Sequence, residues 1–204
     1  MKQEFQISSE DELIDVIGEA NPATQQKVCE VLDEAMIEFI QQSPLVFIST
    51  TDENGLIDIS PKGDAPGFVN VDEQNNLLFP ERPGNKLAFG FKNILRNNNV
   101  GLIFVIPNTR ETLRVKGLAT LTRDPELLDV LSAQNKPAIL CTHIEVKESF
   151  FHCGKAMIRS KAWQPDFWSD GGKSLMAKQL SRKFNEQESA MTEHLEESYR
   201  ERLY

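Results

Sequence analysis

Apolar residues follow a helical repeat in the first part of the chain. Between Pro22 and Ile40 they recur at spacings of three and one, which is typical of an amphipathic helix lying on a core. The members of this repeat are Val28, Val31, Leu32, Ala35, Met36, Phe39 and Ile40. The sequence therefore predicts a helix that begins at Pro22, has Asn21 as its N-cap and ends before Ser43-Pro44.

After Pro44 the pattern changes to short apolar or alternating runs separated by turn residues. Seven runs are predicted to be strands: residues 45–50, 56–60, 68–71, 77–79, 100–107, 112–122 and 138–146. Asn54-Gly55 suits a hairpin turn between the first two runs. Gly117, inside the sixth run, indicates a β-bulge or a close backbone approach.

Helical segments interrupt and follow these strands. We expect helices over residues 85–97, 126–133 and 149–160, and a charged, helix-prone segment from Ser174 onward. The first of them is expected to bury Leu87, Phe91, Ile94 and Leu95. Most gaps between strands are too short for helical crossovers, which disfavours a parallel α/β fold. The pattern favours a mainly β fold, a small antiparallel barrel with flanking helices, and a two-layer α+β sheet is the alternative.

Composition narrows the class of protein. The chain has 204 residues and a formal net charge of −9, which argues against sequence-independent binding of nucleic acid or of an anionic membrane. Its three cysteines show no CxxC spacing, as expected in a reducing compartment. The N-terminus does not resemble a signal peptide, and no apolar run reaches the length of a membrane span. We therefore expect a soluble, cytoplasmic protein.

One stretch, Phe79 to Arg96, carries the most chemistry. It combines the end of a strand, a Pro/Gly loop and a predicted helix start at which Asn85 suits the N-cap. Gly84 allows a close backbone approach, and Arg82 and Lys86 bring two positive charges to the turn. The start of a helix attracts anions, so the stretch predicts a phosphate site. The alternative is a capped helix with two solvated cations.

Longer segments carry a family resemblance. They are PLVFISTTDENGLIDISPKGDAPGFV, NNLLFPERPGNKLAFGFKNILRNNNVGLIFVIP, RETLRVKGLATL and FHCGKAMIRSKAW. Over about residues 44–163 the chain resembles the FMN-binding split-barrel proteins, the pyridoxamine 5'-phosphate oxidase-like family. The resemblance implies a split β-barrel of six to seven strands and a homodimer with FMN in two clefts at the subunit interface. It divides the chain into a helical lead-in (1–42), an FMN-binding split-barrel domain (43–170) and a charged helical tail (171–204).

The resemblance also implies a cofactor-binding set. Its members are Ser60, Pro61, Lys62, Gly63, Phe79, Pro80, Arg82, Asn85, Lys86, Thr112 and Arg114. Residues 60–63 and 79–80 correspond to segments beside the flavin ring and ribityl chain, residues 82–86 to the phosphate site, and residues 112–114 to the strand that reaches the flavin of the partner subunit.

Two departures from the family pattern limit what the resemblance implies. Asn85 stands where the oxidase itself has an arginine, so Arg82 is expected to replace that charge. The basic C-terminal segment with which the oxidase holds its pyridoxal phosphate substrate is not recognisable in ESYRERLY. Oxidation of vitamin B6 is therefore not implied.

Further polar residues are candidates for the site. A positive Lys62 beside the ring would stabilise an anionic reduced flavin. Arg114 and Lys116 share one side of a strand. Either could carry positive charge to a substrate or a phosphate across the interface, and a solvated strand face is an equally good interpretation.

A predicted helix supplies the remaining candidates. Lys155 and Arg159 share a face of it and, with Trp163, are expected to border a substrate cleft or else to be ordinary surface residues. His152 and Cys153 would point about 100° apart on that helix, so no metal site is expected.

These residues lead to hypotheses of different classes. The first is an FMN-dependent oxidoreductase that acts on an unidentified small organic substrate. The alternative is a non-catalytic flavin- or haem-binding protein for storage, sensing or electron transfer. FMN is the expected cofactor, with deazaflavin and haem as alternatives, and a third hypothesis is a cofactor-free interaction module.

Overall fold

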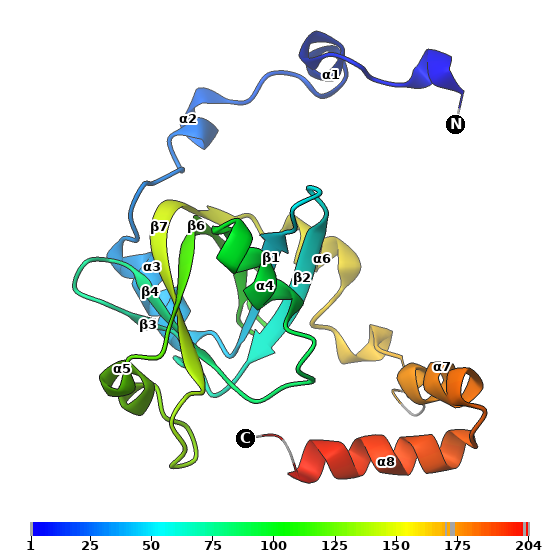
Figure 1. Cartoon of the computed structure of the whole chain (residues 1–204). Helices are drawn as coiled ribbons and strands as arrows, with labels where there is room; N and C mark the ends of the chain where they lie inside the picture. Colours follow the sequence, from blue (N-terminus) through cyan, green and yellow to red (C-terminus); the bar gives the residue numbers. More distant parts are fainter. Residues whose placement is uncertain (1, 170, 172–173, 202, 204) are drawn as a thin grey trace.

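Seven antiparallel strands form a single sheet that curves around the core of the molecule (Figure 1). The structure is a computed structural model that describes residues 2–169, 171, 174–201 and 203. The strands are β1 Leu45–Thr51, β2 Ile57–Gly63, β3 Asn70–Val71, β4 Leu77–Glu81, β5 Asn99–Val105, β6 Thr112–Thr122 and β7 Leu140–His152. Their order in the sheet is β2-β1-β5-β6-β7-β4-β3. The predicted mainly β fold, a small antiparallel split β-barrel, is confirmed.

Short helices surround the sheet. They are η1 Gln3–Phe5, α1 Glu10–Ile17, α2 Pro22–Gln25, α3 Glu34–Gln42, α4 Phe89–Arg96, α5 Pro125–Val130, α6 Lys155–Ser160, η2 Pro165–Phe167, α7 Leu175–Phe184 and α8 Glu188–Glu201. α7 and α8 pair as a hairpin beyond the barrel (Figure 1). In the part of the chain that the structure describes, no helix combines the length and the apolar character needed to cross a membrane.

The two faces of β1 show how the strands place the core. Val46 and Ile48 are buried, whereas Phe47 between them is 39% exposed on the outer face. This alternation is the period-two pattern expected for a half-buried strand. Met36 and Ile40 of α3 belong to the same buried cluster as the inward residues of the sheet. The inner face of the sheet and α3 therefore enclose one core.

The predicted helix from Pro22 to Ile40 is wrong as a single element. The chain forms two helices, α2 and α3, joined by an extended segment in which Cys29 and Ser149 exchange backbone hydrogen bonds of 2.9 and 2.8 Å. Asp33 then starts α3, because its carboxylate accepts a hydrogen bond from the Met36 backbone N–H. Bridging to β7 replaces the helical hydrogen bonds that residues before Asp33 would otherwise make.

The helix after the Pro/Gly loop begins later than predicted. Asn85 is not its N-cap, because the Asn85 side chain accepts a hydrogen bond from the backbone N–H of Leu87 inside the loop. Lys86 and Ala88 adopt left-handed backbone with φ of 62° and 56°, and α4 starts only at Phe89. The delayed start also turns Leu87 outward. Of the four apolar residues expected to be buried, Leu87 and Leu95 are exposed.

The predicted helix over residues 149–160 is half strand. β7 continues to His152, which pairs with Thr112 of β6, and α6 begins at Lys155. The long partner strand β6 holds this segment extended. Similarly, residues 61–63, predicted to lie in a loop, extend β2, where an edge strand accepts Pro61 without losing a ladder hydrogen bond. Residue 170, at the predicted boundary of the tail, lies outside the described residues.

Gly117 marks the predicted irregularity, which is confirmed by a shift of the β6–β7 register between Lys116 and Gly117. A Cβ at Gly117 would lie 2.4 Å from the backbone oxygen of Glu145. We expect Gly117→Ala to lower the free energy of unfolding by about 1–3 kcal/mol, the usual cost of overpacking. Urea unfolding followed by circular dichroism measures this change. Gly84→Ala, whose Cβ would meet nothing within 4 Å, is the matched control, and equal losses would contradict the packing argument.

Candidate functional site

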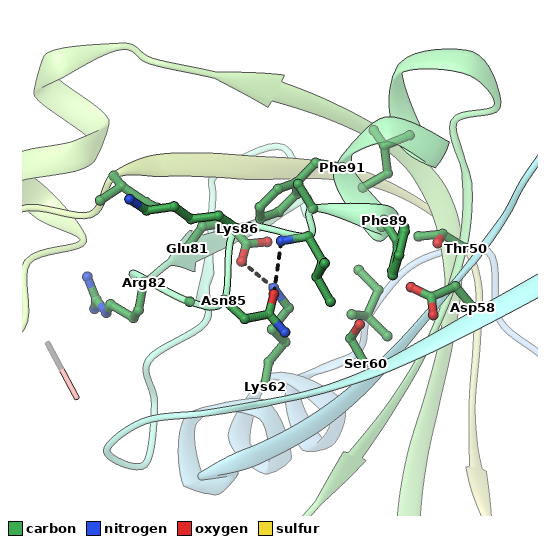
Figure 2. Close-up of a pocket in the computed structure, with 17 residues that line it drawn as sticks. Thr50, Asp58, Ser60, Lys62, Glu81, Arg82, Asn85, Lys86, Phe89 and Phe91 are labelled. Atoms are coloured by element: carbon green, nitrogen blue, oxygen red, sulfur yellow. Dashed lines mark hydrogen bonds and ion pairs between the residues drawn. The ribbon is translucent and has the colours of Figure 1, made fainter. Parts of the chain in front are cut away.

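A cavity of about 260 Å³ opens between the inner face of β1 and β2, the end of β4 and the loop that leads into α4 (Figure 2). Its lining includes Ser60, Lys62, Arg82, Asn85 and Lys86 of the predicted cofactor set. The remaining lining residues are Ile48, Thr50, Asp58, Glu81, Gly84, Leu87, Ala88, Phe89, Gly90, Phe91, Ile94 and Ile139. Cations and carboxylates lie among apolar walls in this cavity.

A buried carboxylate holds one of the cations. Glu81 is 2% exposed, and one of its carboxylate oxygens lies 2.6 Å from Lys62 Nζ. The Thr142 hydroxyl donates a hydrogen bond of 2.8 Å to the other oxygen. Lys62 Nζ also lies 4.9 Å from the centroid of the Phe91 ring, within the range of a cation–π contact. These contacts fix Lys62 in the cavity and offset its charge.

Arg82 makes a second ion pair. Its Nε lies 2.9 Å from Asp64 Oδ2, and both side chains are largely buried. Arg82 Nη1 is buried as well, and within the described residues it has no hydrogen-bond partner. A buried guanidinium N–H without an acceptor costs free energy, which makes this atom a candidate ligand-binding group.

The loop at Asn85 and Lys86 adds further donors. Lys86 forms no ion pair with any residue that the structure describes. Among the residues with described positions, no side chain caps the start of α4, so an N-cap does not satisfy the first backbone N–H groups of this helix. Phe89, Gly90 and Phe91 from that first turn line the cavity. A free ammonium and uncapped helix donors together favour an anion here.

The opposite end of the cavity has a different character. Thr50 and Asp58 lie there beside Phe89, as Figure 2 shows. Buried Asn93 donates a hydrogen bond of 3.0 Å to the Thr50 hydroxyl. The cavity is therefore cationic where the loop crosses it and has a carboxylate at its far end.

Sequence reasoning missed several residues of this site. Asp58 follows from the strand period, because Asp58, Ser60 and Lys62 alternate along β2 and share its inner face. Glu81 gives no comparable signal, because its partner Lys62 lies on another strand. Phe89 and Phe91 were not predicted to line the cavity, because the helix was expected to start at Asn85 and not at Phe89.

A second hollow, of about 460 Å³, adjoins the cavity. It shares Ser60, Lys62, Glu81, Arg82, Gly84 and Asn85 with it. Pro61, Gly63 and Pro80 of the predicted set line this hollow, and so does Leu203 near the C-terminus. The two hollows together bring eight of the eleven predicted cofactor residues to one region, those at positions 60–63, 80, 82, 85 and 86. The three that they exclude are at positions 79, 112 and 114.

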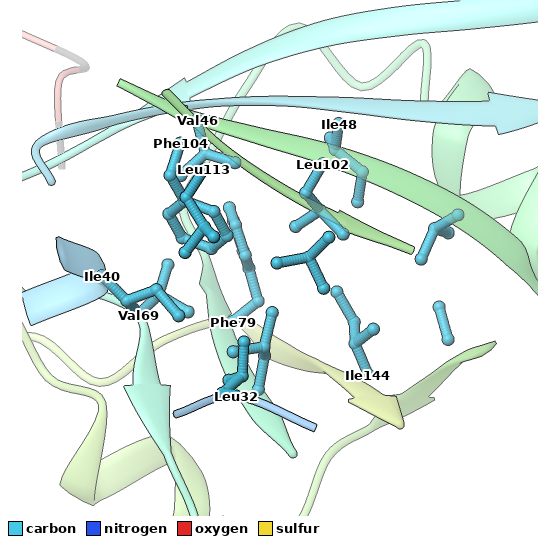
Figure 3. Packing of buried hydrophobic residues seen from close by; sticks show 14 of the residues in the cluster. Leu32, Ile40, Val46, Ile48, Val69, Phe79, Leu102, Phe104, Leu113 and Ile144 are labelled. Atoms are coloured by element: carbon cyan, nitrogen blue, oxygen red, sulfur yellow. The ribbon is translucent and has the colours of Figure 1, made fainter. Parts of the chain in front are cut away.

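The other predicted residues lie elsewhere in this chain. Phe79 is fully buried in the core, as Figure 3 shows. Thr112 is buried at the start of β6. Arg114 stacks over Phe150 on the outer face of the sheet, where it lines a shallow hollow of about 780 Å³ with Lys116 and His152. Burial there, and then the charge of Arg114, lower the pKa of His152.

The predicted substrate-cleft residues lie outside the cavity. Lys155 and Arg159 are exposed on α6. Trp163 lines a separate groove next to α6, and its Nε1–H donates a hydrogen bond of 2.7 Å to the Thr109 carbonyl. Among the described residues no three His, Cys, Asp or Glu side chains form a metal-binding group.

The Lys62–Glu81 pair gives a prediction that is independent of any ligand. Lys62→Met leaves the Glu81 carboxylate buried without its counter-ion, and we expect the free energy of unfolding to fall by at least about 2 kcal/mol. Lys116→Met, which breaks the half-exposed Lys116–Glu148 pair of 2.7 Å, is the control, and its loss should stay below about 1 kcal/mol. Denaturant unfolding of both variants measures the difference, and a smaller loss for Lys62→Met would refute the structural role of the buried pair.

Comparisons with known proteins place the chain. The curated proteins gave no match. Among solved structures, HupZ of Group A Streptococcus is 17% identical, covers 59% of this chain and 94% of its own, and has a TM-score of 0.49. A Clostridium acetobutylicum protein related to general stress protein 26 is 16% identical, with coverage of 60% and 91% and a TM-score of 0.46. General stress protein 26 of Bacillus anthracis is 14% identical, with coverage of 56% and 88% and a TM-score of 0.43.

The strongest assignment comes from a family model rather than from single structures. The model described as pyridoxamine 5'-phosphate oxidase matches residues 32–153. This range begins at Leu32, next to the N-cap of α3, and ends at Cys153, directly after β7. This range is well over half of the 204 residues and includes every strand of the barrel. The chain belongs to the pyridoxamine 5'-phosphate oxidase family.

Proposed function

We propose that this protein is an FMN-dependent oxidoreductase that acts on a small organic substrate. Membership of a family with a flavin-binding, oxidoreductase-type fold supports the class of activity. The observation that carries the proposal is the buried Arg82 Nη1, which has no partner among the described residues, in a cavity that Lys86 also lines.

The residues fit the phosphate end of FMN. Arg82 contributes a buried N–H that lacks an acceptor, and Lys86 contributes an ammonium without an ion pair in the described part of the chain. Charge-assisted bonds from both groups to a phosphate are stronger than bonds between neutral groups. Asn85 does not replace the missing cation, because its amide carries no charge; its oxygen accepts a hydrogen bond from the Leu87 backbone N–H. We therefore assign the phosphate to Arg82 and Lys86.

The residues also fit an aromatic ring system. Ile48, Phe89, Phe91 and Ile94 supply apolar walls, and Lys62 is held over Phe91 by Glu81. When bound, a flavin supplies the hydride and electron transfer, while the protein binds it, orients it and tunes its electronics. In this arrangement Glu81 keeps the Lys62 ammonium in place, and Asp58 and Thr50 offer acceptors at the far end of the cavity.

Of the alternative cofactors, a deazaflavin fits the site as well as FMN does, and haem fits it less well. A deazaflavin carries the same kind of phosphate and would use the same cations. Haem needs an axial ligand such as His, Cys, Met or Tyr. None of the described residues that line the cavity is of these types, so we favour a flavin over haem.

The outer face of the sheet supports a dimer. The outer face of the sheet exposes Phe47, Ile57, Ile59 and Ile103, which line the 780 Å³ hollow together. A contiguous exposed apolar face of this kind is typical of an interaction surface. We propose that two chains pair through this face and complete each other's flavin sites.

The proposed location is the cytoplasm. Cys29, Cys141 and Cys153 are all free thiols, and burial raises the pKa of Cys141 to about 11. Free thiols without a disulfide suit a reducing compartment.

The phosphate assignment predicts how FMN binding responds to mutation. Arg82→Ala combined with Lys86→Ala removes two charge-assisted hydrogen bonds, and we expect the Kd for FMN to rise at least about 100-fold. Titration of the apoprotein with FMN, followed by visible absorption and gel filtration, measures this change.

A matched control uses two cations of α4 that lie outside the cavity. Lys92→Ala combined with Arg96→Ala removes the same charge and should leave FMN affinity within about twofold, since exposed charges are screened. Unchanged affinity in the Arg82/Lys86 double variant would refute the site. A spectrum typical of haem or of a deazaflavin in the purified protein would show that this group, and not FMN, is the cofactor. Turnover with a nicotinamide donor would distinguish an enzyme from a carrier.

The dimer interface predicts a second effect. Ile59→Glu places a charge in the centre of the exposed apolar face, and we expect the Kd of the dimer to rise at least about 30-fold, because a charge buried at an interface is unpaired. Sedimentation equilibrium measures it. Leu95→Glu, at a 75% exposed position on α4, is the control and should leave the dimer intact. A wild-type chain that sediments as a monomer would disprove the dimer outright.

A further inference from the structure

The first part of the chain forms an arm that stays exposed and does not pack against the described residues of its own barrel. Every residue between Lys2 and Val28 whose burial the structure describes is exposed. Figure 1 shows α1 lying clear of the sheet at the end of this arm. The arm nevertheless carries large apolar side chains, and Phe5, Val16 and Ile17 are 74%, 70% and 69% exposed. Such exposure in a short segment calls for a surface that covers it.

The helix α1 has a capped start and one apolar face. Ser9 caps it, and Glu12 reaches back to the Ser8 backbone N–H, which completes a box of hydrogen bonds at its start. Leu13, Ile14 and Ile17 share one face of the eight-residue helix. An isolated helix of this length is only marginally stable in water. A docking surface is therefore needed to hold it.

The character of α1 restricts that surface. The helix contains four acidic residues and no basic one. With 100° per residue, Glu10 lies within the apolar face and Asp11 at its edge, whereas Asp15 points to the opposite side. The complementary surface must therefore be apolar and bordered by cations. An anionic membrane would repel this helix.

A groove beside α6 has this composition. Its volume is about 250 Å³, and Arg110, Met157, Ile158, Lys161 and Trp163 contribute to its lining. Ile158 is 53% exposed, and the neighbouring Phe167 and Trp168 are 57% and 58% exposed.

Cations border this groove. Lys155 and Arg159 extend along α6, next to Arg110 and Lys161 of the lining, and none of the four forms an ion pair with a described residue. Glu111 and Asp166 are the acidic residues nearest to these cations in the sequence. The positive charges outnumber them, so the rim of the groove is basic.

We propose that the acidic helix α1 of one protomer docks into the α6 groove of a second copy of this chain. Leu13 and Ile17 would cover Ile158 and Trp163, and Glu10 and Asp11 would face Lys155 and Arg159. Opposite charges at the rim of an apolar contact favour one orientation and one partner.

The second copy is the occupant because one chain carries both surfaces and leaves both open. Its own arm is held at the root by the Cys29–Ser149 bridge and extends away from the barrel (Figure 1). In a symmetric dimer the same contact forms twice, once for each arm. The proposal rests on the homodimer put forward above, and it adds to the sheet-face interface a second interface of different composition.

The two tryptophans of the chain report on this contact. Trp163 lines the groove, and the Nε1–H of Trp168 donates a hydrogen bond of 2.8 Å to the carbonyl of Ala162, the residue before Trp163. We expect Leu13→Glu combined with Ile17→Glu to shift tryptophan emission to the red and to increase its quenching by acrylamide, compared with wild type. Asp15→Lys, on the opposite side of the helix, should change neither. Identical emission and quenching in wild type and in the double variant would overturn the docking.

Charge reversal tests the orientation. Glu10→Lys with Asp11→Lys should release the arm, and adding Lys155→Glu with Arg159→Glu in the same chain should restore the protected tryptophan signal. A failure of this restoration, together with normal folding of the fourfold variant by circular dichroism, would reject the proposed pairing of charges.

Cross-linking identifies the occupant. Leu13→Cys and Ile158→Cys are introduced together in a Cys153→Ser background, and mild oxidation is followed by non-reducing electrophoresis. We expect a disulfide-linked dimer, whereas Leu13→Cys alone should give none. An intrachain disulfide would show docking within one chain and overturn the exchange, and no disulfide would overturn the docking.

Sedimentation of the same protein keeps the two proposals apart. A dimer without the cross-link rejects only the exchanged arm and leaves the sheet-face dimer standing. A monomer rejects both.

Discussion

The candidate site depends on a carboxylate that is almost completely buried. Glu81 ends β4, in the part of the sheet that pairs with β7, and it holds Lys62 of β2, which lies at the other edge of the sheet order. The Thr142 hydroxyl satisfies its second oxygen. Removing one partner of a buried ion pair is strongly destabilising, because the remaining charge has no water around it. The pair therefore joins two ends of the barrel and also fixes the cation that faces the cavity.

The edge strand β2 connects this cavity with the proposed interface. Its side chains alternate, so Asp58, Ser60 and Lys62 face the cavity while Ile57 and Ile59 face outward. Residues 57–60 and Lys62 thus line the candidate cavity on one side of the strand and the proposed interface on the other. If the proposed ligand and the proposed second subunit bind at these two faces, they restrain the same backbone, and a single strand would couple ligand binding to assembly.

The strands and the fold could largely be predicted from the sequence, because period-two alternation and turn residues are local signals. The run Thr112–Thr122 was predicted with the bounds of β6. The helices failed where tertiary contacts override the local pattern. Residues 28–31 continue a helical stripe, yet the backbone of Cys29 pairs with Ser149, 120 positions away.

The site shows the same division between local and distant signals. Of the cofactor residues that the family resemblance implied, those at positions 60–63, 80, 82, 85 and 86 line two adjoining hollows. The strand period accounts for Asp58 beside them. Glu81 could not be predicted, because only the folded sheet brings its strand next to Lys62. Nor could the left-handed backbone at Lys86 and Ala88, which delays α4 and turns its uncapped start toward the cavity.

The register shift at Gly117 changes which side chains of β7 point inward. Lys116 pairs with Glu148 and Gly117 with Val146, so Lys147 is the extra residue between them. The strand therefore has two phases: even-numbered residues such as Ile144 point inward before the extra residue, and odd-numbered residues such as Ser149 point inward after it. A single residue inserted here without a second bulge would turn Ser149 outward, separate the arm root from the barrel, and move His152 from the outer face to the inner one. Loss of Lys147 alone would instead remove the bulge and keep the pairings on both sides of it.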